Sequence, residues 1–152
     1  MTERDSQRSR VYAWEDRVVA AKDPSQIAFA AAQGMIDAIW AEMGLLYPPR
    51  AAPMPAQARR RIADANRLTL RLQATTPSWC LLHELAHAMT TTHDGVSDGH
   101  GPAFMGVYVT LLGRYLRLDE AALIQSARDA GIQVTPDAKP VFADALIRHP
   151  RA

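Results

Sequence analysis

The first clear periodicity along the chain is that of an amphipathic helix. After Pro24 and Ser25, apolar residues recur at every fourth position, and they are Ile27, Ala31, Met35, Ile39 and Met43. Positions four apart lie on one face of a helix, so this spacing predicts a helix with a buried face. Gly44 follows at the position where a glycine often ends a helix. We therefore expect a helix that opens at Pro24 and ends before Gly44.

A second periodicity, of two residues, indicates a strand over 67–72. Apolar and polar residues alternate there, which gives a strand one buried face and one solvated face. The buried face is predicted to consist of Leu68, Leu70 and Leu72. The solvated face is predicted to consist of Arg67, Thr69 and Arg71. Before this strand, residues 47–55 contain four prolines and predict an irregular loop.

Capping signals predict three further helices, over 76–90, 102–115 and 119–131. They begin with a Thr-Pro pair, a proline and an aspartate respectively, all of which favour a helix N-terminus. Residues 91–101 are rich in turn formers and predict a loop. The pattern over 11–21 fits either a strand or a short helix.

Length and apolar content indicate one domain. The chain has 152 residues, of which 48% are apolar, and that is enough for one hydrophobic core. We expect an α+β domain over 1–152, with a sheet of about three strands packed against helices. Its start, over 1–10, is predicted to be frayed, and 136–152 to form a tail.

Charge and cysteine content limit which partners the protein is expected to bind and in which compartment we expect it. The net charge of +1 provides no basic field for nucleic acid. No apolar run is long enough to span a membrane, and the polar start has no signal-peptide core. Cys80 is the single cysteine, so an internal disulfide is excluded. We expect a cytoplasmic protein that binds neither nucleic acid nor a membrane.

Chemistry is concentrated in the motif H-E-x-x-H, formed by His83, Glu84 and His87. On a helix the two imidazoles project from one face, one turn apart, so both can reach one metal ion. Neutral imidazoles suit Zn²⁺ at about 2.0–2.1 Å. Glu84 lies at the edge of that face, where it could act as general base towards a zinc-bound water.

A catalytic zinc usually has three protein ligands, and two histidines are candidates for the third. His93 gives the spacing H-E-x-x-H-x5-H, but Thr90 then occupies a turn position at which a β-branched residue is unfavourable. His100 is flanked by glycines that allow a close backbone approach, and Pro102 after it can begin a helix. We favour His100 and keep His93 as the alternative.

The segment from Leu81 to Leu112 resembles a known family. H-E-x-x-H, a polar loop and G-H-G-P-x-F are similar to the SprT-like zinc metalloproteases, and to small bacterial proteins classed only as metallohydrolases. The resemblance implies a minimal zincin-like core, with His83, His87 and His100 as zinc ligands and Glu84 as catalytic residue. A single cysteine cannot supply the zinc ribbon of the Spartan-type members, and no long basic tail is present. The DNA-repair role of those members is therefore not expected.

These features predict a zinc-dependent hydrolase, a metallopeptidase acting on protein or peptide substrates. Two alternatives stay open: hydrolysis of a non-peptide amide, and a non-catalytic binding or regulatory module stabilised by zinc. In zincin folds the strand before the active-site helix borders the cleft, so we expect 67–72 to pair with an extended peptide.

For several residues near the motif we expect structural or supporting roles. Cys80 is expected to be a small core residue rather than a ligand. Asp98 either faces solvent or orients a ligand imidazole. An oxyanion formed on a scissile carbonyl needs a donor beyond the metal, and Tyr108, Arg114 and Tyr115 follow the third ligand on one helix. Packing on the core is the expected role of Tyr108.

Overall fold

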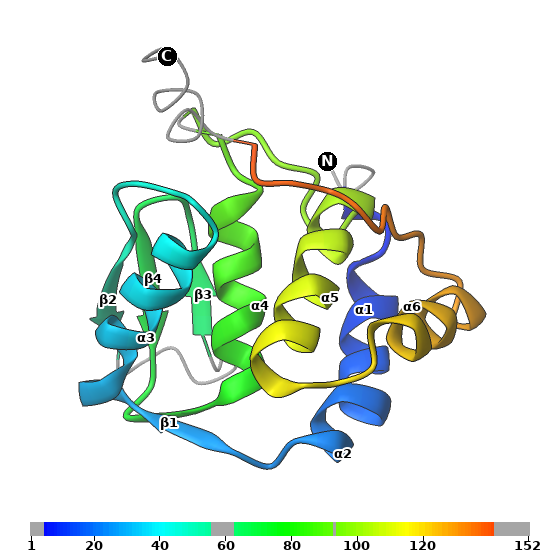
Figure 1. Ribbon diagram of the computed structural model, residues 1–152, viewed down its shortest axis with the longest axis horizontal. Helices are drawn as coiled ribbons and strands as arrows, with labels where there is room; N and C mark the ends of the chain where they lie inside the picture. Colours follow the sequence, from blue (N-terminus) through cyan, green and yellow to red (C-terminus); the bar gives the residue numbers. More distant parts are fainter. Residues whose placement is uncertain (1–4, 56–62, 93, 142–152) are drawn as a thin grey trace.

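The computed structural model describes residues 5–55, 63–92 and 94–141, and its fold is α+β (Figure 1). Helix α4, Ser78–Met89, lies at the centre, with a three-stranded sheet on one side and helix α5, Pro102–Leu116, on the other. The predicted α+β class is confirmed. Within the described residues, no helix is both long enough and apolar enough to cross a bilayer.

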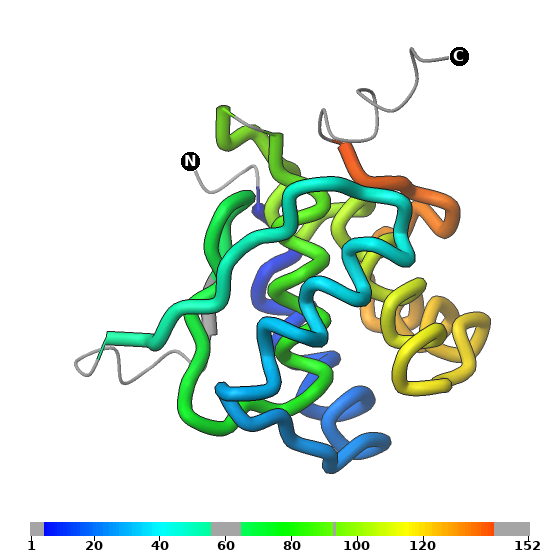
Figure 2. Tube along the Cα trace, turned by 60° about the vertical axis from the view of Figure 1, so that its left-hand side comes forward, coloured from blue at the N-terminus to red at the C-terminus, as the bar shows by residue number. Residues whose placement is uncertain are grey.

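The chain begins with a helical run of three segments: α1, Arg8–Trp14; η2, Glu15–Val19, which is a π-helical turn; and α2, Ala20–Lys22. This run lies beside α4, blue against green in Figure 2. The ambiguous pattern over 11–21 is thus helical, with Val11, Trp14 and Val19 buried.

The prediction of a frayed start is wrong for residues 5–10. Gln7 is only 6% exposed, and its side chain hydrogen-bonds to the backbone of Gln133. These contacts, which join residues 126 positions apart, hold the segment in the fold. Residues 1–4 lie outside the described residues.

The helix expected from Pro24 begins later, because its first residues pair as a strand. Strand β1, Gln26–Ala28, is antiparallel to β5, Thr75–Pro77, and helix α3 then runs over Phe29–Glu42. Gly44 has a φ of 81°, and the Gly44 and Leu45 N–H groups donate to carbonyls of the last turn. The predicted glycine terminus of this helix is confirmed.

The main sheet has the order β2-β4-β3, with β2 over Arg50–Pro53, β3 over Ala63–Ala65 and β4 over Thr69–Leu72. Strand β2 is parallel to β4, and β3 is antiparallel to it. The prediction of an irregular loop over 47–55 is therefore wrong for residues 50–53, while 47–49 and 54–55 are irregular as predicted. An edge strand tolerates proline because one side of its backbone needs no partner.

The faces of β4 agree only in part with the alternating pattern. Leu70 and Leu72 are buried, but Leu68 is 66% exposed. Arg67, predicted to be solvated, is 4% exposed and lies over the Trp40 ring at 5.1 Å. The long arginine side chain buries its stem on the aromatic ring, which a polar–apolar pattern cannot register.

Strand β4 is the middle strand, so the expectation that 67–72 pairs with a peptide is wrong. Both of its edges are already hydrogen-bonded, to β2 and to β3. The strand that packs most extensively against α4 is β3, which is at the edge of the sheet.

The helices after the sheet lie near their predicted positions. Helix α4 begins at Ser78 rather than at 76, because Thr76 pairs with β1. Helix α5 begins at Pro102 as predicted, and α6, Glu120–Asp129, is capped by the Asp119 carboxylate, which accepts from the Ala122 N–H at 3.1 Å.

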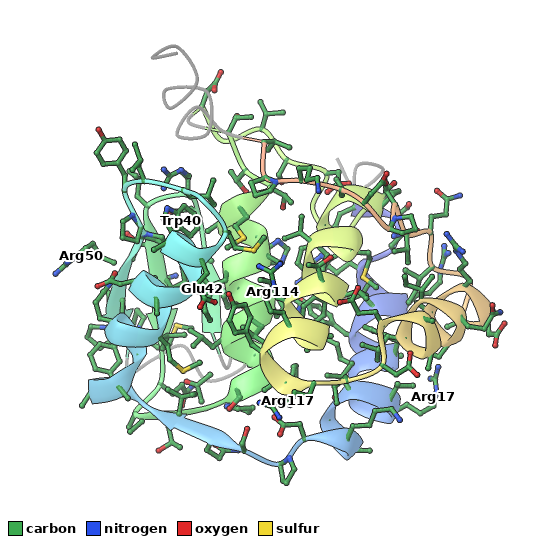
Figure 3. All side chains as sticks on the ribbon, in the orientation of Figure 1. Arg17, Trp40, Glu42, Arg50, Arg114 and Arg117 are labelled. Atoms are coloured by element: carbon green, nitrogen blue, oxygen red, sulfur yellow. The ribbon has the colours of Figure 1, made fainter. Side chains whose placement is uncertain are left out.

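Helices α3 and α5 contact each other near their C-terminal ends, at the front of Figure 3, where Glu42 and Arg114 are labelled. The Tyr115 hydroxyl donates to Glu42 at 2.5 Å, and Arg114 donates to the Met43 sulfur at 3.4 Å. After α6 the chain crosses back over α4, where the Val141 N–H donates to Met89 O at 3.0 Å. The rest of the predicted tail, 142–152, lies outside the described residues.

Candidate metal centre

Three imidazoles converge on one point between α4 and α5. His83 and His87 lie one turn apart on α4, and His100 lies two residues before the start of α5. Their Nε2 atoms form a nearly equilateral triangle with sides of 3.1, 3.2 and 3.3 Å. Tetrahedral ligands at about 2.0–2.1 Å from Zn²⁺ are about 3.3 Å apart, so the three nitrogens fit this ion. The alternative ligand, His93, lies outside the described residues.

Burial keeps two of these imidazoles neutral. His83 is 3% exposed, and burial lowers its pKa to about 3. Burial also lowers the pKa of His87 well below its ordinary value, and the neighbouring imidazoles act in the same direction. The neutral ring is the form that offers a lone pair to a metal, so neither group has to lose a proton at neutral pH before it binds.

His83 is oriented by a buried carboxylate from the N-terminal helical run. Its Nδ1 hydrogen-bonds to Glu15 Oε2, and the Tyr108 hydroxyl donates to the same oxygen at 2.6 Å. Burial raises the pKa of Glu15 to about 8, and the hydrogen bond from Tyr108 opposes this rise. A proton on Nδ1 leaves the Nε2 lone pair directed at the centre. Tyr108 is fully buried, as expected, but it also holds the carboxyl group that orients His83 and does not only fill the core.

His100 has an equivalent partner in Asp5. Its Nδ1 lies 3.0 Å from Asp5 Oδ2, and its backbone N–H donates to Asp5 Oδ1 at 2.8 Å. Burial alone would raise the pKa of Asp5, but the hydrogen bonds from His100 outweigh it and hold this pKa below its usual value. The Gln7 side chain also donates to the carbonyl of His100, at 2.9 Å. Two ligands thus have carboxylate partners on the N-terminal segment.

The glycines beside His100 make room for two carboxylates. Gly99 has a φ of 64°, and a Cβ there would lie 2.8 Å from the Asp5 carboxyl carbon. A Cβ on Gly101 would lie 2.6 Å from Asp98 Oδ2. Asp98 accepts from the Ala103 N–H at 2.8 Å, so it caps α5 and does not orient an imidazole. We expected these glycines to let the backbone approach a metal. In the structure they instead let the backbone approach the side chains of Asp5 and Asp98.

Aromatic rings hold the imidazoles from the side. Phe104, which is fully buried, stacks on His87 with centroids 4.3 Å apart and an angle of 22°. Tyr12 of α1 stacks on His83 at 6.0 Å and meets His100 edge-on at 5.0 Å. Contacts of this kind restrict rotation of the rings and preserve the triangle of nitrogens.

The three nitrogens lie on the wall of a cavity of about 770 Å³. Glu84 lines the same cavity beside the histidines and is 6% exposed. Cys80 also lines it, but burial raises the pKa of its thiol far above the usual range, which disfavours the thiolate needed for a metal bond. The arrangement offers three neutral nitrogen ligands, a carboxylate and space for a ligand.

Asp5 and Glu15 are the parts of the site that the sequence analysis missed. A signal for Glu15 was present, because it stands four positions from both Val11 and Val19, which are buried on the same helical run. A carboxylate within an apolar stripe requires a polar partner in the core. For Asp5 the local sequence holds no comparable signal.

Comparisons with protein families, with curated proteins and with solved structures found no match to this chain.

Proposed function

We propose that this protein is a zinc-dependent hydrolase of the metallopeptidase type, as the resemblance to the SprT-like proteases implies. The observation that carries the proposal is the triangle of Nε2 atoms of His83, His87 and His100, with sides of 3.1 to 3.3 Å. Those three residues would hold Zn²⁺. Once bound, the ion would polarise a carbonyl and make a water molecule more acidic.

Among the residues of this chain, Glu84 would transfer the proton during hydrolysis. Glu84 follows His83 in the sequence and lines the same cavity. Its carboxylate can accept a proton there from the attacking water. It would then deliver that proton to the leaving nitrogen, because an amine leaves far more readily when it is protonated. A structural zinc site has no need of such a carboxylate, and it usually has four protein ligands rather than three.

A peptide is the favoured substrate because of the strand nearest the cavity. Ala65 of β3 and the adjacent Asn66 line the cavity. Across the described part of the chain, β3 pairs with β4 alone. An extended peptide could add to its other edge and be held by main-chain hydrogen bonds, which tolerate varied side chains. A compact non-peptide amide would make no use of that edge.

The test compares zinc content and peptidase activity in wild type and Glu84→Gln. We expect one zinc per chain in both proteins, with hydrolysis of unfolded casein by the wild type and its loss in the variant. His100→Ala should lose the metal, and His93→Ala, the matched control, should retain it.

Three results would contradict the proposal in different ways. A zinc-loaded wild type that cleaves small amides but no peptide would favour the non-peptide hydrolase. A zinc-loaded wild type with no hydrolytic activity would indicate a binding module. Full activity in Glu84→Gln would remove Glu84 from its assigned role.

A further inference from the structure

Hydrolysis of an amide places negative charge on the carbonyl oxygen, and the cavity is poorly suited to that charge. The carboxylates of Asp5, Glu15, Asp16 and Glu84 are among the groups that line it. Within the described residues of the lining, Arg8 is the one arginine or lysine. An oxyanion there requires a hydrogen-bond donor aimed at it.

The tyrosines that follow His100 on α5 cannot supply this donor. Tyr108 is fully buried and already donates to Glu15 at 2.6 Å. Tyr115 donates to Glu42 on α3 at 2.5 Å. Tyr47 is 64% exposed, with its backbone beside Arg67. Of the four tyrosines, all of which the structure describes, only Tyr12 lines the cavity.

Tyr12 is held directly over the metal ligands. Its ring stacks on His83 with an interplanar angle of 16° and meets His100 edge-on at 5.0 Å. The side chain is nevertheless accessible, since the residue is 42% exposed. A donor in this place stands beside the triangle of nitrogens while remaining within reach of a bound substrate.

Arg8 is the cation beside Tyr12. It lies one helical turn earlier on α1, with Cζ 5.6 Å from the centroid of the Tyr12 ring. Because a guanidinium can only donate, it cannot accept the hydrogen of the Tyr12 hydroxyl, which remains available to another group.

We propose that Tyr12 is a catalytic residue whose hydroxyl donates a hydrogen bond to the oxyanion formed at the scissile carbonyl. This inference rests on the proposed hydrolase function. The water oxygen bonds to the carbonyl carbon, one water proton passes to Glu84, and the π electron pair moves to the carbonyl oxygen facing Tyr12. The electron pair on the oxyanion then re-forms the carbonyl double bond while the C–N bond breaks. The C–N electron pair passes to nitrogen, and nitrogen takes the proton from Glu84. Tyr12 keeps its own proton throughout.

The experiment compares zinc-loaded wild type, Tyr12→Phe and Tyr47→Phe, which loses the same hydroxyl away from the cavity. Tyr12→Phe keeps the ring on the imidazoles, so zinc affinity and KM for unfolded casein should stay within about twofold of wild type. Loss of an oxyanion donor should lower kcat about 100-fold. The affinity for a phosphinate analogue of an alanine dipeptide, measured by calorimetry, should fall in the same ratio because its tetrahedral anion mimics the oxyanion. Tyr47→Phe should match wild type in every measurement.

Two outcomes would overturn the inference while the proposed function stands. One is an active wild type whose kcat and phosphinate affinity are unchanged by Tyr12→Phe. The other is a variant that loses zinc along with activity, since the hydroxyl would then support the metal rather than the substrate. A wild type that binds zinc but neither cleaves casein nor binds the phosphinate would instead overturn the hydrolase function itself.

Discussion

Each of two imidazoles at the centre uses its two nitrogens for different purposes. In His83 and His100, Nε2 faces the common point while Nδ1 faces a carboxylate, Glu15 or Asp5. The carboxyl group fixes the ring orientation, and in its ionised form its charge makes the facing nitrogen a stronger ligand. The affinity of the site for a metal would therefore depend on side chains that do not themselves bind the metal.

Replacing Glu15 by glutamine should therefore weaken zinc binding. A zinc ion on Nε2 would favour the ionised form of Glu15, and the amide keeps an acceptor for Nδ1 but cannot carry that charge. Loss of such a partner typically lowers metal affinity about 10-fold to 100-fold. Competition with a chromophoric chelator would measure the change. Asp129→Asn, which alters an exposed carboxylate bonded to Gln125, is the control and should bind zinc as wild type does. Equal affinities in the two variants would argue against the orienting role of Glu15.

At the scale of helices and strands, capping residues predicted the starts of helices better than the periodicity of apolar residues did. Pro102 and Asp119 each lie at a helix N-terminus where the sequence predicts one. Thr76 has the same local appearance, yet it lies in a strand because β1 pairs with β5. That pairing joins segments about fifty positions apart, so it cannot be predicted from the residues around Thr76 alone.

The candidate site shows the same division between local and distant contacts. The helical spacing of His83 and His87 was sufficient to place them together, and the glycines and proline around His100 were sufficient to favour it as their neighbour. The roles of Asp5 and Gly99 could not be predicted, because the N-terminal segment reaches the site only through tertiary contacts.

The cap on α5 should affect the metal centre as well as the helix. Asp98→Ala removes an acceptor from the first turn, and we expect the free energy of unfolding to fall by about 1 kcal/mol. Because the Asp98 carboxylate closes the segment 98–103, which contains His100, zinc affinity should also fall, by about tenfold. Urea denaturation and chelator competition would measure the two effects.

The matched control is Asp119→Ala, which removes a similar cap from α6. It should lower the free energy of unfolding by a similar amount. Zinc affinity should not change, because α6 supplies none of the three imidazoles. An equal loss of affinity in both variants would mean that the cap acts through general stability alone.

At the scale of the whole molecule, the buried groups make stability depend on pH. We expect the metal-free protein to be most stable near pH 6.5. Burial lowers the pKa values of His83 and His87 from 6.5, that of His83 to about 3, and raises that of Glu15 from 4.5 to about 8. Between pH 4.5 and 6.5 the unfolded chain binds two more protons at the histidines and one fewer at Glu15. Stability should therefore fall by about 1.4 kcal/mol for each unit of acidification.

Above pH 6.5 the sign reverses. The histidines are then neutral in both states, while Glu15 remains protonated only in the folded state up to pH 8, so stability should fall as the pH rises. Urea denaturation of the chelated protein from pH 5 to 8 would trace the maximum. Glu15→Gln should remove the decline on the alkaline side, and its persistence there would show that another group causes it.

The bonds from Gln7 to His100 and to Gln133 have a consequence for how the protein is made. A chain emerging from a ribosome presents the paired histidines of α4 long before residue 133 exists. Until then Gln7 can bond to His100 but not to the backbone of Gln133, so one of its two attachments is missing. Under the proposed function, firm binding of a metal ion would thus await synthesis of nearly the whole described chain.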